Sequence, residues 1–110
     1  MALNFRIIYT ESVDFDLNEV YYYIFNKLHN PDAAANQLKR IILAVDKLSS
    51  NPRIHRVRGR DSHGRELRSF PVDNYVVIYS VDDDKSVVNI LHVFYSKRDI
   101  DSLIFPEQKS

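Results

Sequence analysis

Apolar residues in the first part of the chain change from a strand-like period to a helix-like period. From residue 3 to residue 9 they alternate with mainly polar neighbours, which is the period of a half-buried strand. Carboxylates at Glu11, Asp14 and Asp16 favour the start of a helix, because they lie near the positive end of its dipole. The next apolar residues trace one face of that helix, namely Val13, Leu17, Val20, Tyr21, Ile24, Phe25 and Leu28.

A second helix follows after a break of a few residues. Asn30 is a favourable N-cap, and Pro31 is tolerated at the first helical position because its missing N–H would have no partner there. This helix is expected to end near residues 49–52, since the residue before Pro52 disfavours helix. The short break predicts an antiparallel hairpin of helices that packs on a sheet through Ala34, Leu38, Ile41, Val45 and Leu48.

The second half of the chain is dominated by strand patterns. Residues 53–65 are polar, contain a glycine and are predicted to form a loop. Strands are predicted over residues 66–70, 75–81 and 87–94, with a tight turn at residues 82–85. The last strand is almost continuously apolar, which predicts a central position in the sheet. Residues 96–104 are expected to add a short helix, and residues 106–110 to fray.

These elements predict an α+β fold with the order β-α-α-β-β-β. A helix hairpin packs on a small, mainly antiparallel sheet, and residues 1–105 form a single domain, which suits a chain of 110 residues. The chain contains no cysteine, so disulfides and thiolate metal sites are excluded. Its four histidines show no metal-binding spacing, and we expect neither a metal nor a cofactor. No apolar stretch suits a signal peptide or a membrane span, so a cytoplasmic protein without membrane contact is expected.

Charge is distributed unevenly although the formal net charge is zero. Asp82, Asp83 and Asp84 form an acidic group. The opposite charge gathers in one polar stretch, which predicts a basic face that binds phosphate or an acidic partner, or else a solvated loop with some ion pairs. That stretch contains Arg53, Arg56, Arg58, Arg60, Arg65 and Arg68.

The whole chain resembles the RelE/ParE superfamily of toxins. The element order and length are similar, and five stretches match in sequence order: residues 16–24, 30–34, 48–52, 65–68 with 72–79, and 93–99. The resemblance implies the toxin of a bacterial type II toxin–antitoxin pair, which inhibits growth and is neutralised by a cognate antitoxin. It covers nearly all of the chain, although no stretch is specific by itself.

This superfamily contains two activities on one scaffold, so the fold does not decide the mechanism. RelE-like members cleave messenger RNA in the ribosome, whereas ParE-like members poison DNA gyrase without known nuclease chemistry. Nuclease members commonly carry an arginine where this chain has Val76, and residues 74–79 and 95–99 resemble the ParE-like form. The resemblance therefore favours action on DNA gyrase, a protein target, without bond cleavage by this chain.

Ribosome-dependent cleavage of mRNA is the alternative. Metal-free RNA cleavage requires a base, cations for the phosphorane charge and an acid for the leaving oxygen. Arg68, Tyr95 and Arg98 are the candidates for this chemistry, although the favoured explanation of Tyr95 is a strand-end tyrosine packed on the core with its hydroxyl in solvent. His92 is expected to be a hydrogen-bonded structural histidine on the face opposite Tyr95, which shares its own face with Leu91 and Val93. For a target or phosphate we expect contacts from Arg58, Arg65, Arg68, Lys97 and Arg98.

The resemblance also predicts how the antitoxin binds. Antitoxins of this kind wrap a helix and an extended tail around the toxin, a mode that coupled folding and binding allows. Tyr22 and Tyr23 lie partly off the apolar face of their helix, and with Arg56 they are the predicted antitoxin contacts. The alternative explanation of Tyr22 and Tyr23 is structural: the helix has a wide apolar face because it packs both on the second helix and on the sheet. A third hypothesis is a non-toxic regulatory partner that meets operator DNA only through its antitoxin.

Overall fold

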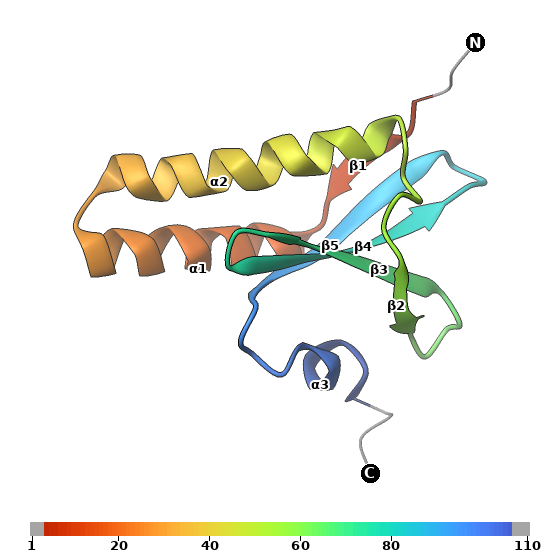
Figure 1. Ribbon diagram of the computed structural model, residues 1–110. Helices are drawn as coiled ribbons and strands as arrows, with labels where there is room; N and C mark the ends of the chain where they lie inside the picture. Colours follow the sequence, from red (N-terminus) through yellow and green to blue (C-terminus); the bar gives the residue numbers. More distant parts are fainter. Residues whose placement is uncertain (1–3, 107–110) are drawn as a thin grey trace.

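A computed structural model describes residues 4–106 of the chain and confirms the predicted α+β fold (Figure 1). The predicted start of the first strand at residue 3 and most of the tail, residues 107–110, lie outside the described residues. The elements in chain order are β1 (Arg6–Tyr9), α1 (Glu11–Leu28), α2 (Pro31–Asp46), the 3-10 turn η1 (Lys47–Ser49), β2 (Val57–Arg60), β3 (Glu66–Val72), β4 (Tyr75–Asp82), β5 (Val87–Tyr95) and α3 (Ile100–Ile104).

The two long helices begin at side-chain caps, as the sequence predicted for the second of them. Thr10 accepts the N–H of Val13 at 3.3 Å, and Asn30 accepts the N–H of Ala33 at 3.2 Å. Between the helices His29 adopts a left-handed conformation (φ 51°), which lets the chain reverse within two residues. Figure 1 shows α1 and α2 side by side as an antiparallel hairpin. No helix in the described part of the chain is long and apolar enough to cross a membrane.

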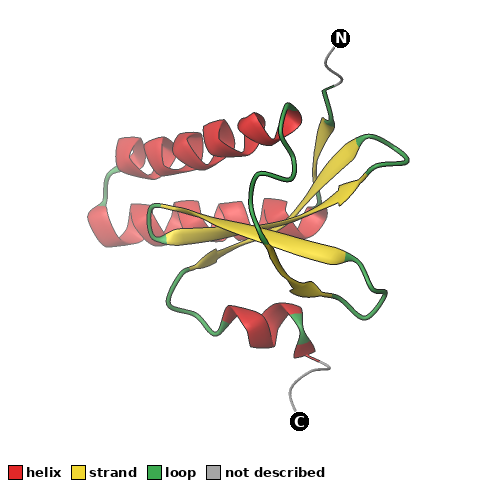
Figure 2. Cartoon of the chain, turned by 45° about the vertical axis from the view of Figure 1, so that its right-hand side comes forward, coloured by secondary structure: helices red, strands yellow, loops and turns green. Residues whose placement is uncertain are grey.

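The sheet has the strand order β1-β5-β4-β3-β2, and only β1 pairs in parallel, with β5. The last strand, β5, is thus an interior strand, but it lies beside the edge strand β1, and β4 occupies the predicted central position. Helices lie on both sides of the sheet (Figure 2). The α1–α2 hairpin covers one face around Val13, Ile41, Val45 and Tyr79, all of them almost inaccessible to solvent. The short α3 covers part of the other face, where Leu67, Ile78, Phe94, Ile100 and Phe105 form a second apolar cluster.

A bulge interrupts the regular alternation of β5. Ile78 of β4 lies opposite His92, but the next residue, Tyr79, lies opposite Ile90, so β5 carries one extra residue. Val93 consequently packs in the hairpin-side core, whereas Leu91 packs against the α3-side cluster. The expectation that Tyr95 shares a face with both Val93 and Leu91 is therefore wrong for Leu91, because strict alternation takes no account of a bulge.

The helix α1 is tied to β5 just beyond this bulge. β1 pairs with β5 only as far as Ile90, and past that point Asp16 accepts the N–H of Val93 at 3.1 Å. The same Asp16 oxygen lies 3.0 Å from Nδ1 of His92, whose ring stacks on Phe94. His92 is thus a hydrogen-bonded histidine, as predicted. Because an unpaired buried N–H costs about 1–3 kcal/mol, this carboxylate stabilises the junction of helix and sheet.

The predicted loop over residues 53–65 is wrong in its middle, which forms the edge strand β2. Three of its four residues, Val57, Gly59 and Arg60, pair antiparallel with β3, and a register shift separates Val57 from Gly59. A four-residue strand that contains a glycine and two arginines gives too weak a pattern to be recognised. Tertiary contacts hold it instead, because Arg58 bonds to Asp101 at 2.7 Å and the ring of Phe105 lies directly over Gly59.

The segment that leads into β2 is also anchored. Arg68 donates a hydrogen bond to the carbonyl of His55 at 2.6 Å, and the hydroxyl of Tyr79 donates to the carbonyl of Pro52 at 2.7 Å. The His55 ring stacks on Phe70 with 4.2 Å between ring centroids. Burial lowers the pKa of His55 below its ordinary value of 6.5. The arginine-rich connection is thus partly fixed on the sheet.

Gly59→Ala is expected to destabilise the protein. A Cβ at this position would lie 2.6 Å from Cζ of Phe105, so the buried ring would have to shift. Overpacking of this kind costs about 1–3 kcal/mol, which urea unfolding measures. Gly59→Ala combined with Phe105→Leu should lose less free energy of unfolding than the sum of the two single changes, because the smaller side chain makes room. If the losses of the two single variants simply added in the double variant, the close contact between Gly59 and Phe105 would be contradicted.

His55 should make the protein less stable as the solution becomes acidic. The unfolded chain takes up a proton at its ordinary pKa of 6.5, before the folded chain does, so stability falls as pH drops below that value. His55→Phe retains a stacking ring and removes the titration, so its free energy of unfolding should fall less between about pH 7 and pH 5. Carboxylates with lowered pKa, such as Asp83, act below about pH 4 and do not interfere. Equal losses in both proteins would refute the assignment.

Candidate functional site

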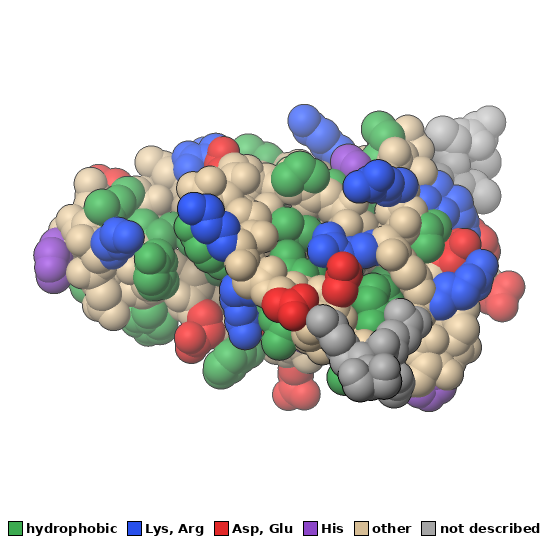
Figure 3. Space-filling view, turned by 60° about the horizontal axis from the view of Figure 1, so that its bottom comes forward, with side chains coloured by type: hydrophobic (Ala, Val, Ile, Leu, Met, Phe, Trp, Pro, Cys, Tyr) green, Lys and Arg blue, Asp and Glu red, His purple; other side chains and the backbone are tan. Residues whose placement is uncertain are grey.

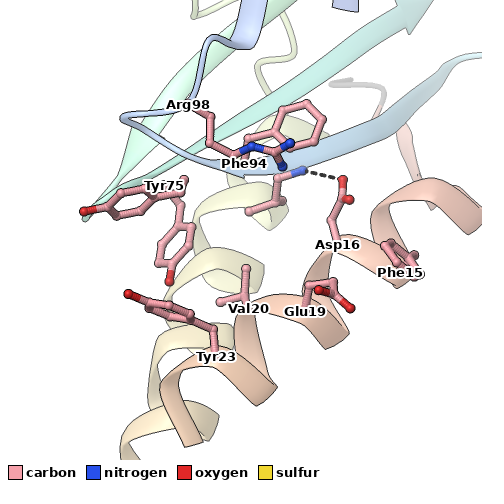
Figure 4. A pocket seen from close by; sticks show the side chains of 10 residues that line it. Phe15, Asp16, Glu19, Val20, Tyr23, Tyr75, Phe94 and Arg98 are labelled. Atoms are coloured by element: carbon pink, nitrogen blue, oxygen red, sulfur yellow. Dashed lines mark hydrogen bonds between the residues drawn. The ribbon is translucent and has the colours of Figure 1, made fainter. Parts of the chain in front are cut away.

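A pocket of about 330 Å³ lies between α1 and the ends of β4 and β5 (Figure 4). One wall is a face of α1, and the other wall comes from the sheet and from the turn after β5. The wall of α1 consists of Phe15, Asp16, Glu19, Val20 and Tyr23, and the opposite wall of Tyr75, Val93, Phe94, Tyr95 and Arg98. The pocket is thus built where the helix leaves the sheet.

Five of the ten residues that line this pocket are aromatic. Tyr75 and Tyr95 lie opposite each other on β4 and β5, with their rings 6.0 Å apart at 66°. Burial, with the nearby hydroxyls of Tyr23 and Tyr95, raises the pKa of Tyr75 above its ordinary value, which keeps this phenol neutral. At the mouth, Phe15 is 64% exposed and Tyr23 is 56% exposed. Exposed aromatic rings around a pocket are typical of a surface that binds another molecule.

The charged groups of the pocket differ in how they are satisfied. Asp16 is occupied by His92 and by the N–H of Val93, the bond drawn in Figure 4. Glu19 on the same wall forms no ion pair within residues 4–106. Arg98 on the opposite wall lies over the ring of Phe94, 5.2 Å from its centroid, and also pairs with no carboxylate of the described chain. The pocket therefore presents one free acid and one free cation on facing walls.

The three candidate nuclease residues are not brought to one place. Tyr95 and Arg98 line the same pocket, but Arg68 does not. Arg68 pairs with Tyr79 in the strand register, whereas Tyr95 pairs with Tyr75. Four residues along β4 correspond to a separation of about 13 Å along the strand. Arg68 instead holds the segment before β2 through the carbonyl of His55.

Carboxylates neutralise most of the predicted basic cluster. Arg53 forms two bonds with Asp83, at 2.9 and 2.5 Å, which hold the pKa of that carboxyl below its usual value. Figure 3 shows acidic side chains interspersed with basic ones on one face of the molecule. Among residues 4–106, Arg56 and Lys97 are exposed and form no ion pair. The pairs of the other arginines are Arg58–Asp101, Arg60–Glu66, Arg65–Asp61 and Arg68–Glu66.

Apart from Tyr23, the residues of the α1 wall are not predicted as site residues from the sequence. The pattern places Asp16 at the start of a helix, but it does not show that Asp16 binds two groups of β5. A signal was present, since Phe15 lies off the apolar face of its helix. The predicted antitoxin contacts Tyr22 and Tyr23 are 60% and 56% exposed, and Tyr23 joins the pocket. No three metal-ligating side chains lie together among the described residues.

Solved structures with a similar fold are toxin–antitoxin complexes. The chromosomal ParDE system of P. aeruginosa matches with a TM-score of 0.68 and 18% identity, covering 84% of this chain and 97% of that chain. An archaeal RelE–RelB complex from Pyrococcus horikoshii matches with a TM-score of 0.59 and 22% identity, covering 87% of this chain and 99% of that chain. The RelBE2 complex of Mycobacterium tuberculosis matches with a TM-score of 0.58 and 21% identity, covering 86% of this chain and 94% of that chain. These likenesses establish the fold.

The family comes from the sequence itself. No curated protein sequence matches the chain. The family model described as "ParE toxin of type II toxin-antitoxin system, parDE" matches residues 7–100, which span the chain from β1 to the start of α3. The matched region contains both long helices, the whole sheet except Arg6 of β1, and both walls of the pocket. The chain belongs to the ParE toxin family and is a type II toxin of the RelE/ParE superfamily.

Proposed function

We propose that this toxin inhibits growth by binding DNA gyrase, without cleaving a bond itself, and that a cognate antitoxin neutralises it. The observation that carries the proposal is the pairing of the arginines. Arg53, Arg58, Arg60, Arg65 and Arg68 each lie within ion-pair distance of a carboxylate. An RNA phosphate would have to displace these carboxylates, so the cluster is poorly suited to hold RNA.

The pocket also suits a protein better than a nucleic acid. Its charged groups are two carboxylates and one guanidinium, which do not attract a phosphate backbone. Its exposed aromatic rings are the side chains that protein interfaces favour. Val76, which replaces the arginine common in nuclease members, packs against the apolar cluster beneath α3. A protein target agrees with each of these features.

Ribosome-dependent cleavage of mRNA is the second candidate. Tyr95 and Arg98 share one pocket, which favours it, and the phenol would act as the acid beside the guanidinium. However, among the described residues Arg98 is the single cation that lines this pocket, and Asp16 and Glu19 would repel the phosphorane. The site therefore supports cleavage less well than protein binding.

This chain has exposed residues available to bind the proposed antitoxin. Tyr22, Tyr23 and the unpaired Arg56 are all exposed, and Arg56 would suit an acidic tail. The structures with this fold were solved as complexes with antitoxins, which supports such a partner. A regulatory role without toxicity, with operator DNA met only through the antitoxin, is the remaining hypothesis. We retain the cytoplasm as the proposed location, because gyrase acts there.

The proposed target is tested by purified components. The toxin should stop growth when induced without antitoxin, and it should inhibit supercoiling by purified DNA gyrase while leaving ribosome-bound mRNA intact. Tyr95→Phe should change the inhibition less than about three-fold, because a ring suffices for packing, whereas a nuclease would lose its acid. Full supercoiling with cleaved mRNA would establish the second candidate, and normal growth on induction would favour the regulatory role.

A further inference from the structure

We infer that the pocket between α1 and β5 anchors the antitoxin through two opposite charges, a basic side chain beside Glu19 and an acidic side chain beside Arg98. This inference rests on the proposed pairing with an antitoxin. It assigns a place and a charge pattern to that contact, which the predicted contacts Tyr22, Tyr23 and Arg56 do not. It concerns binding alone and requires no chemistry from the pocket.

The charges of the pocket decide which occupant fits. A purely apolar side chain would cover Glu19 and Arg98 without giving either a partner, and burying an unpaired charge is costly. An anionic occupant would face Asp16 and Glu19 on one wall, and a cationic occupant would face Arg98 on the other. An occupant with both charges, placed toward opposite walls, satisfies each group.

The two groups are available and well placed for such an occupant. Asp16 is already bound to His92 and Val93, which leaves Glu19 as the free carboxylate on the α1 wall. Figure 4 shows Glu19 rising from α1 and Arg98 lying across the pocket over Phe94. The Glu19 and Arg98 residues are both exposed. Neither group has to leave an existing ion pair in the described chain before it meets a partner.

The size and rim of the pocket point to a protein segment. A volume of about 330 Å³ is at the lower end of the range for small-molecule sites, roughly 300–1,000 Å³. The rings of Phe15 and Tyr23 stand exposed at its mouth, where they would extend a flat contact around an inserted side chain. Anchor residues in small pockets surrounded by aromatic contacts are a common feature of protein interfaces.

The test compares neutral variants with matched controls. Glu19→Gln and Arg98→Gln each remove one pocket charge, and Glu11→Gln and Lys85→Gln remove the same charges outside the pocket. Glu11 lies at the start of the same helix, and Lys85 lies in the turn between β4 and β5. Calorimetric titration with the purified cognate antitoxin should show about ten-fold weaker binding for each pocket variant and less than two-fold change for each control.

Salt and folding measurements complete the test. The binding of the parent toxin should weaken more steeply with salt than that of either pocket variant, because a charge pair has been removed. Thermal unfolding checks that all variants fold alike, as expected for exposed side chains. Unchanged affinity in either pocket variant overturns the two-charge anchor, and so does loss of gyrase inhibition with unchanged antitoxin affinity. If the parent toxin binds no antitoxin at all, the proposed pairing itself is refuted.

Discussion

The carboxylate of Asp16 is the contact on which the junction of helix and sheet depends. β1 stops pairing with β5 at Ile90, and Asp16 then accepts the N–H of Val93 in place of a strand. The bulge in β5 turns Val93 toward the helix hairpin and Leu91 toward α3. Because α1 is held at this point, its next turns, with Glu19 and Tyr23, face Tyr75 and Tyr95 across the pocket.

The second constraint is the internal neutralisation of charge. The formal net charge is zero, and many of the opposite charges lie beside each other in ion pairs, such as Arg53–Asp83 and Arg58–Asp101. Exposed pairs of this kind contribute little stability, typically 0–1 kcal/mol, so their main effect is on what the surface attracts. A surface of alternating charges attracts a phosphate backbone only weakly. The few charged groups without an ion pair then decide which partner the surface binds. Within residues 4–106, the charged groups without an ion pair include Arg56, Lys97, Glu19 and Arg98.

The pocket lies where the core meets the surface: Val20, Tyr75 and Val93 belong to the core, whereas Phe15, Glu19, Tyr23 and Arg98 are exposed. The core residues, such as Val13, Ile41 and Tyr79, only bring the helix hairpin and the sheet together. The residues that line the pocket come from α1, from the start of β4, from the end of β5 and from the turn that follows it. Substitutions of the exposed members change the chemistry of the surface without disturbing the buried contacts.

The sequence by itself determined the helix hairpin, the strands after residue 65, the interior place of β5 and the family. Periodic burial and capping leave strong local patterns, as at Asn30 and in the apolar run of β5. Only the tertiary structure decided that β2 is a strand, that β5 bulges, that most arginines are paired, and that Arg68 lies apart from Tyr95. Each of these depends on contacts between residues distant in the chain, such as Arg58 with Asp101 and Asp16 with Val93, and local periodicity does not record such contacts.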